Sequence, residues 1–133
     1  MNRSLRRLAF WAYTAALLYG THGPRRDVDV PGIDRPDLVV HLCAFGGWFV
    51  LLLATEYIGP WRAGRSLVLC ALIGAAFAAV NESTQALPVF ARTAAWDDYL
   101  ANLGGIAAGM LLAWAAARVW PARPRADGRP DER

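Results

Sequence analysis

The sequence contains no lysine, and all 14 of its basic residues are arginines. Charge is also scarce where the chain is most apolar: charged residues make up 19% of the 133 residues and collect between the hydrophobic runs and at the two ends. The hydrophobic fraction is 56%, whereas soluble domains have about 45–50% apolar residues. Mean hydropathy is +0.24. This distribution excludes an ordinary soluble core and is typical of a single-domain, multi-span membrane protein.

Cysteine is rare too, and both cysteines, Cys43 and Cys70, lie within apolar runs. In the topology predicted below, they are near opposite ends of consecutive helices, on the order of 20 Å apart at 1.5 Å per residue. A disulfide needs Cα atoms within about 7 Å. We therefore expect two small buried residues and no disulfide.

Motifs of soluble enzymes are also missing. The sequence has no phosphate-binding loop, no nucleophile elbow and no HExxH. A lone histidine among carboxylates, without a nearby cysteine, is a poor zinc site, so we expect no metal and no cofactor. The net charge of +3 could attract nucleic acid, but the arginines flank hydrophobic segments, as orientation signals and phospholipid contacts do. We therefore expect membrane lipids, and no nucleic acid, as partners.

Four apolar segments are separated by polar turns that contain proline and glycine. They predict an all-α membrane protein with four transmembrane helices and short loops, in one domain over residues 1–120. The predicted helices cover about residues 5–21, 38–58, 66–87 and 98–120. Residues 121–133 have no apolar periodicity and are expected to form a disordered cytoplasmic tail.

The first segment allows a second interpretation. It is short for a span, which needs about 20 residues, although its flanking arginines can snorkel and lengthen it. A basic start before a short apolar stretch also describes a signal peptide. Because its alanine-rich part offers no clean cleavage site, we expect a retained helix.

Arginine counts predict the orientation, since cytoplasmic loops are enriched in positive charge. One side of the predicted topology holds ten arginines: Arg3, Arg6, Arg7, Arg62, Arg65, Arg118, Arg123, Arg125, Arg129 and Arg133. The other side holds four: Arg25, Arg26, Arg35 and Arg92. We therefore expect both termini in the cytoplasm.

Three predicted helix ends on the outer side each carry a pair of polar residues on one helix face. The pairs are Asp37 with His41, Glu82 with Gln85, and Asp98 with Asn102. Arg92 lies in the loop that joins two of these ends. Ionisable groups at this depth are costly and usually pair or mark a functional site, so these seven residues form the candidate polar site.

Each pair also has a purely structural explanation. Asp98, or Asp97 before it, can cap the last helix, and Asn102 can hydrogen-bond a neighbouring helix. Glu82 lies at a helix C-terminus, where the dipole disfavours an acid, so it should need Arg92 or His41 as a partner.

Gly105 and Gly109 form a GxxxG pattern in the last segment. In membranes this spacing lets two helix backbones approach closely. We expect both glycines to serve in helix packing.

These motifs together resemble the VanZ-like family of small bacterial membrane proteins. The family pattern has Asp-Lys-x-x-His at the start of one span, Glu-x-x-Gln at the end of the next, and an arginine six residues before an Asp-x-x-x-Asn that leads into spaced glycines. This chain matches that spacing from about residue 37 to residue 109. It departs from the pattern at Leu38, in place of the lysine, and at Ala91, where glycine is frequent.

The resemblance implies a multi-pass protein of the bacterial plasma membrane, within the cell envelope. The founding member of the family is associated with resistance to teicoplanin, a lipid-tailed glycopeptide that binds peptidoglycan precursors at the outer face of the membrane. The resemblance thus implies antibiotic resistance as a function, and glycopeptides or lipid-linked envelope precursors as partners.

Three hypotheses for function remain open at this point. In the first, the outer polar site engages a lipid-linked or amphiphilic ligand, with Arg92 contacting an anionic group. In the second, the protein is an enzyme acting on an envelope lipid, with Glu82 or Asp98 as general base and His41 as proton shuttle. In the third, the polar residues only lock the helices together and the protein assists assembly with a partner.

Overall fold

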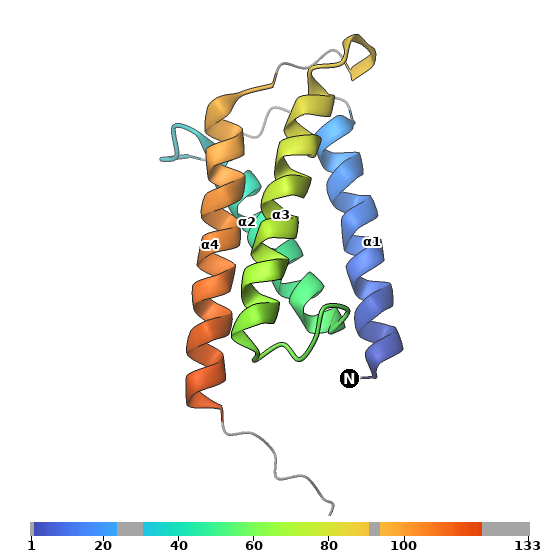
Figure 1. Cartoon of the computed structure of the whole chain (residues 1–133). Helices are drawn as coiled ribbons and strands as arrows, with labels where there is room; N and C mark the ends of the chain where they lie inside the picture. The colour runs from blue at the N-terminus through green and yellow to red at the C-terminus, as the bar shows by residue number, and fades with distance from the viewer. Residues whose placement is uncertain (1, 24–30, 91–93, 121–133) are drawn as a thin grey trace, which may run out of the picture.

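The structure of the protein is a computed structural model that describes residues 2–23, 31–90 and 94–120. Within these ranges it contains only helices: α1 (Arg3–His22), α2 (Pro36–Thr55), α3 (Gly64–Gln85), the 3₁₀ turn η1 (Pro88–Phe90) and α4 (Trp96–Val119). Figure 1 shows that the four α-helices alternate in direction, so that α2 and α4 run the same way. The predicted all-helical fold is confirmed.

Three of the helices are long and apolar enough to cross a membrane. They are α2, α3 and α4, with 20, 22 and 24 residues and mean hydropathies of 2.1, 1.6 and 1.6. α1 also has 20 residues, but three arginines in its first two turns and His22 at its end make it more polar. By length and composition, three helices could therefore cross a membrane.

All four α-helices begin two residues earlier than predicted, and α2 and α3 also end early. α2 stops at Thr55 and not near residue 58, because Glu56 adopts the left-handed conformation at φ 56° and its N–H bonds to the Leu53 carbonyl. α3 stops at Gln85, two residues early, because the Ala86 N–H turns back to the Ser83 and Thr84 carbonyls. The predicted tail over residues 121–133 lies outside the described residues.

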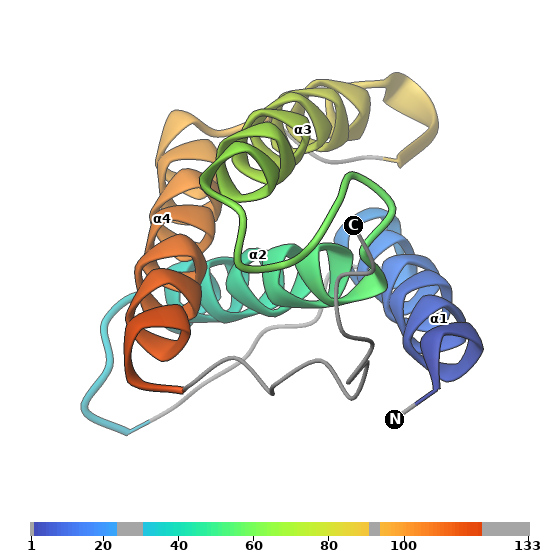
Figure 2. The ribbon, with the colours of Figure 1, turned by 60° about the horizontal axis from the view of Figure 1, so that its bottom comes forward.

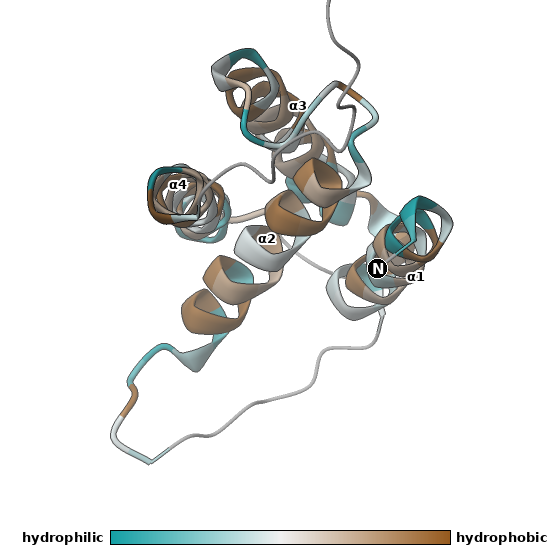
Figure 3. Ribbon diagram, turned by 90° about the horizontal axis from the view of Figure 1, so that it is seen from below, coloured by the Kyte–Doolittle hydropathy of each residue, from teal (hydrophilic) through white to brown (hydrophobic). Residues whose placement is uncertain are grey.

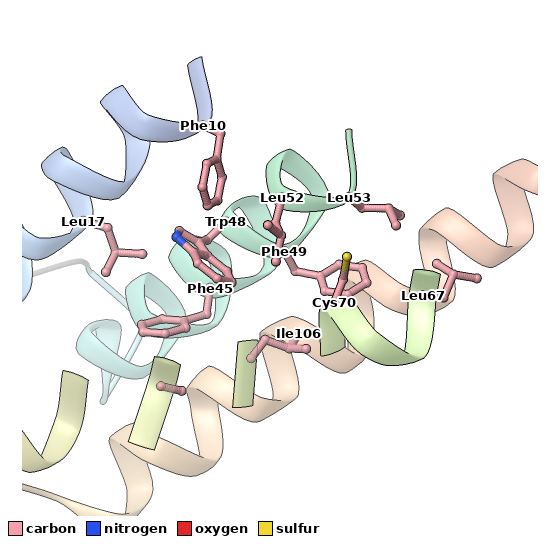
Figure 4. Packing of buried hydrophobic residues seen from close by; sticks show 11 residues of the cluster. Phe10, Leu17, Phe45, Trp48, Phe49, Leu52, Leu53, Leu67, Cys70 and Ile106 are labelled. Atoms are coloured by element: carbon pink, nitrogen blue, oxygen red, sulfur yellow. The ribbon is translucent and has the colours of Figure 1, made fainter. Parts of the chain in front are cut away.

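α2 is the central helix of the bundle and packs against each of the other three (Figure 2). Its aromatic residues form the middle of the core, as Figure 4 shows. Trp48 stacks on Phe77 of α3 with ring centroids 4.5 Å apart. Its indole Nε1–H donates to the Thr14 hydroxyl of α1 at 3.0 Å. Apolar packing and one buried hydrogen bond thus join α1 to α2 at mid-height.

Glycines bring α2 and α4 into backbone contact. A Cβ added at Gly105 would overlap the carbonyl oxygen of Leu42 and lie 2.9 Å from the backbone nitrogen of Gly46. A Cβ at Gly109 would lie 3.0 Å from the Phe49 ring. Both members of the GxxxG pattern therefore lie in the α2–α4 interface, where a side chain would hold the helices apart.

The outward faces of the helices are largely apolar, and hydrophilic residues gather at the near end of α1 and in the α2–α3 turn (Figure 3). Large exposed residues such as Leu72, Leu111 and Leu112 are more than half accessible. Both cysteines are free thiols; Cys70 is buried as expected, but Cys43 is exposed. The expectation of burial was wrong for Cys43 because its side chain points away from the bundle, into the surface that lipid would cover.

Candidate functional site

His41 on α2 and two residues of α4 form the centre of the polar site. The Nδ1 atom of His41 lies 3.0 Å from Oδ1 of Asn102, and its Nε2 lies 3.7 Å from a carboxylate oxygen of Asp98. The side chains of His41 and Asp98 are only 13% and 18% exposed, and Asn102 is fully buried. The parallel course of α2 and α4 brings together residues about sixty positions apart.

The two contacts of His41 orient its ring. An amide oxygen can only accept, so the Nδ1–H of the ring donates to Asn102. The Nε2 atom is then directed at the Asp98 carboxylate, an orientation that suits general acid–base chemistry.

Glu82, near the end of α3, faces the same junction. It is 6% exposed, and its Oε1 accepts the backbone N–H of Ala95 at 2.7 Å. Its Oε2 accepts a longer bond from Gln85 at 3.4 Å. Asp98 and His41 are ionisable neighbours of this carboxylate. The structure thus brings His41, Glu82, Gln85, Asp98 and Asn102 together; we call these five residues the polar cluster.

Among the described residues, Glu82 has a backbone partner that the sequence did not predict. The Ala95 amide, just before α4, donates a charge-assisted bond to its carboxylate. Arg92, the other predicted partner, lies outside the described residues. This backbone contact follows from the return of the chain into α4, and no side-chain pattern signals it.

Asp98 does not cap α4, which corrects one structural explanation. The N-cap is Ala95, which makes no side-chain cap bond, and both Asp97 and Asp98 lie within the first turn. The Asp98 N–H donates to the Asp97 carboxylate at 3.1 Å. The Asp98 side chain is therefore free of a capping role and points to His41.

Asp37 lies outside the polar cluster. Arg35 bridges it to Asp97 at the rim, with N–O distances of 3.0 Å to Asp37 and 2.7 Å to Asp97. All three side chains are about half exposed. Hydrogen bonds to Asp37 and then to Asp97 raise the pKa of the Arg35 guanidinium above its ordinary value. Although Asp37 and His41 share a helix face, Asp37 is one turn further out, beyond the packed part of the bundle.

A second polar group, absent from the predicted site, joins α1 to α3 at the same end of the bundle. The Thr21 hydroxyl donates to Oδ1 of Asn81 at 2.9 Å, and Nε2 of His22 lies 2.9 Å from the Thr84 hydroxyl. Asn81 is 2% exposed. Its position four residues before Gln85, on the same helix face, was the available sequence signal.

Three buried polar atoms around this end have no hydrogen-bond partner within the part of the chain that the structure describes. They are Nδ2 of Asn81, Nδ2 of Asn102 and Oδ1 of Asp98. Buried polar groups are nearly always paired, and an unpaired one costs about 1–3 kcal/mol. Two donors and one acceptor thus remain available for water or for the polar group of a ligand.

The polar cluster does not have the geometry of a metal centre. Across the described ranges, no three His, Cys, Asp or Glu side chains are placed to hold one ion. Its contacts are hydrogen bonds and the approach of His41 Nε2 to the Asp98 carboxylate.

Comparison with known proteins gives no relative: no family model, curated protein or solved structure matches the chain.

Proposed function

We propose that the protein is a four-span membrane protein of the VanZ-like type, whose polar cluster engages the polar head of a lipid-linked or amphiphilic ligand at the outer face of the bacterial plasma membrane. The observation that carries this proposal is the pair of buried atoms in the polar cluster, on Asp98 and Asn102, that have no hydrogen-bond partner among the described residues. A cluster that only locked helices together would be expected to satisfy its own hydrogen bonds.

The packing of α1 supports a fourth span. Phe10, Thr14 and Leu17 are buried on the face toward the bundle, while Leu8 and Trp11 are exposed, as lipid-facing residues are. With four spans, the arginine-rich helix ends face the cytoplasm, and the polar cluster faces outward.

The level of the cluster supports an amphiphilic ligand. His41 is in the second turn of α2, and Asn102 is in the second turn of α4, which is the depth of lipid headgroups for helices of this length. A ligand bound here would keep its apolar part beside the exposed leucines and valines of the bundle. Teicoplanin, with its lipid tail and polar peptide core, has this character, and glycopeptide resistance is the biological role we propose.

Teicoplanin binding to the purified protein in lipid nanodiscs tests the proposal. Asp98→Asn should weaken binding roughly tenfold or more, because a hydrogen bond to a charged group contributes about 1.5–3 kcal/mol. Asp97→Asn is the matched control, since Asp97 is the neighbouring residue and pairs with Arg35 outside the cluster. Equal affinities of the two variants, or no binding to the wild type, would contradict the proposal.

The His41–Asp98 pair favours an enzyme as the second candidate function. A carboxylate 3.7 Å from an oriented imidazole is an arrangement used in general acid–base catalysis. The expected result is turnover of an envelope lipid that is lost in His41→Gln while the folded protein remains. If incubation with total envelope lipids yields no product, the binding function stands alone.

A further inference from the structure

A second group of charged residues lies at the opposite end of the bundle from the polar cluster. Arg3, Arg6 and Arg7 occupy the first turns of α1, and Glu56 and Tyr57 begin the turn that follows α2. We call these five residues the basic cluster. Because α2 ends at Thr55, the basic cluster lies at the boundary of the apolar helices, the level of phospholipid headgroups.

The contacts within the basic cluster are well defined. Arg3 Nε lies 3.3 Å and Arg6 Nη2 lies 3.4 Å from the same oxygen, Oε2 of Glu56. The Arg7 guanidinium lies over the Tyr57 ring, 4.5 Å from its centroid. Among the described residues, Glu56 is the only non-glycine residue with a positive φ. This left-handed backbone conformation is uncommon for a residue other than glycine. In Glu56 it accompanies a carboxylate that is turned toward Arg3 and Arg6.

Charge and hydrogen bonding within the basic cluster are incomplete. The cluster contains three guanidinium groups and one carboxylate, and the two ion pairs, from Arg3 and Arg6, use a single oxygen of that carboxylate. The Nε–H groups of Arg6 and Arg7 are buried without an acceptor among the described residues. The cluster therefore has an excess of positive charge and of donors, which is the complement of a phosphate group.

The surface beside the basic cluster is apolar. Leu5, Leu8 and Trp11 of α1 are 52%, 66% and 58% exposed, and the indole of Trp11 donates to the Tyr57 hydroxyl at 3.2 Å. An acyl chain could lie along these residues while its phosphate meets the arginines. A free phosphate ion would contact only the arginines and would leave the apolar residues uncovered.

We propose that the basic cluster binds the phosphate of one anionic phospholipid in the arginine-rich leaflet, and that this lipid holds α1 against the α2–α3 turn. The terminal nitrogens of Arg6 and Arg7 contact the phosphate, and Glu56 keeps Arg3 and Arg6 in place. This site is independent of the polar cluster and of its ligand.

Native mass spectrometry of the full chain tests the site. The protein is purified in detergent at physiological salt with equal amounts of phosphatidylglycerol and phosphatidylcholine of the same acyl chains. The wild type should retain one phosphatidylglycerol molecule in preference to phosphatidylcholine. The double variant Arg6→Gln/Arg7→Gln should lower that preference roughly tenfold or more, since losing one hydrogen bond to a charged phosphate already changes affinity by about that factor.

Arg65→Gln/Arg118→Gln is the matched control, because it removes the same charge at the same end from two exposed residues. Exposed charges are screened at this salt, so the control should keep the preference. Arg7→Lys keeps the charge but not the planar guanidinium, so its preference for phosphatidylglycerol should lie between those of the wild type and the double variant. This milder variant keeps the test valid if the double variant misfolds. The proposal is overturned by an equal loss in variant and control, by an unchanged preference in the double variant, or by release of the lipid with inorganic phosphate.

Discussion

The contact between α2 and α4 makes a sharp prediction, because Gly104 and Gly105 are neighbours in very different surroundings. A Cβ at Gly105 would overlap the Leu42 carbonyl oxygen and crowd the backbone of Gly46, whereas at Gly104 the nearest atom is the Leu42 side-chain Cδ1 at 3.9 Å. Backbone atoms cannot rotate out of the way as a side chain can. Alanine at position 105 must therefore push the two helices apart.

The magnitudes follow from these distances. Replacing a helical glycine by alanine stabilises a helix by up to about 1 kcal/mol, and Gly104→Ala should show this gain. Overpacking costs about 1–3 kcal/mol, and rigid backbone neighbours place Gly105→Ala at the upper end, for a net loss of about 2 kcal/mol. The two variants should differ in free energy of unfolding by about 3 kcal/mol.

Reversible unfolding in detergent micelles, followed by far-UV circular dichroism during titration with sodium dodecyl sulfate, measures this difference. Gly109→Ala should fall between the other two, because its Cβ would meet the movable Phe49 ring at 3.0 Å and the Gly46 carbonyl oxygen at 3.1 Å. If Gly104→Ala and Gly105→Ala unfold at the same detergent fraction, the close α2–α4 crossing is wrong.

Three further changes test other parts of the structure. Thr14→Val leaves the buried indole N–H of Trp48 without its acceptor and should cost about 1–3 kcal/mol of unfolding free energy; an unaltered stability would refute the α1–α2 contact. Arg35→Gln breaks two half-exposed ion pairs, with Asp37 and Asp97, and should cost less than about 1 kcal/mol in the same assay; a larger loss would mean that this rim is buried. A green fluorescent protein fused after residue 133 should fluoresce in a bacterium if the proposed topology, with four spans and both termini in the cytoplasm, is correct; a dark, intact fusion would contradict that topology.

Much of the fold could be predicted from the sequence because apolar periodicity and breakers are local signals. The four helices were predicted from the apolar runs between turns, and the GxxxG spacing of Gly105 and Gly109 indicated a packing face. The end of α2 was missed because it depends on the left-handed backbone of Glu56. That conformation is uncommon for glutamate, and the ion pairs that accompany it join distant parts of the chain.

The candidate site was predictable where residue spacing alone places side chains on one face of a helix. His41 and Asn102 lie in the second turns of helices that run the same way, and the structure places them 3.0 Å apart. Asp37 shares a helix face with His41, yet it pairs with Arg35 at the rim. Residue spacing gives the helix face, but it does not show at which turn α2 begins to pack against α4. The bond from the Ala95 amide to Glu82 could not be predicted either. Almost every residue has a backbone N–H donor, so no sequence pattern marks this one.

The central claim is that the polar cluster engages an outside ligand, and its most direct test is teicoplanin sensitivity in a susceptible bacterium. Cells would express the wild type, Asp98→Asn or Asp97→Asn, with the membrane abundance of each protein measured in parallel. We predict protection by the wild type and by Asp97→Asn, and loss of protection with Asp98→Asn at equal abundance. Protection by Asp98→Asn equal to that of the wild type, or a wild type that does not protect, would contradict the claim.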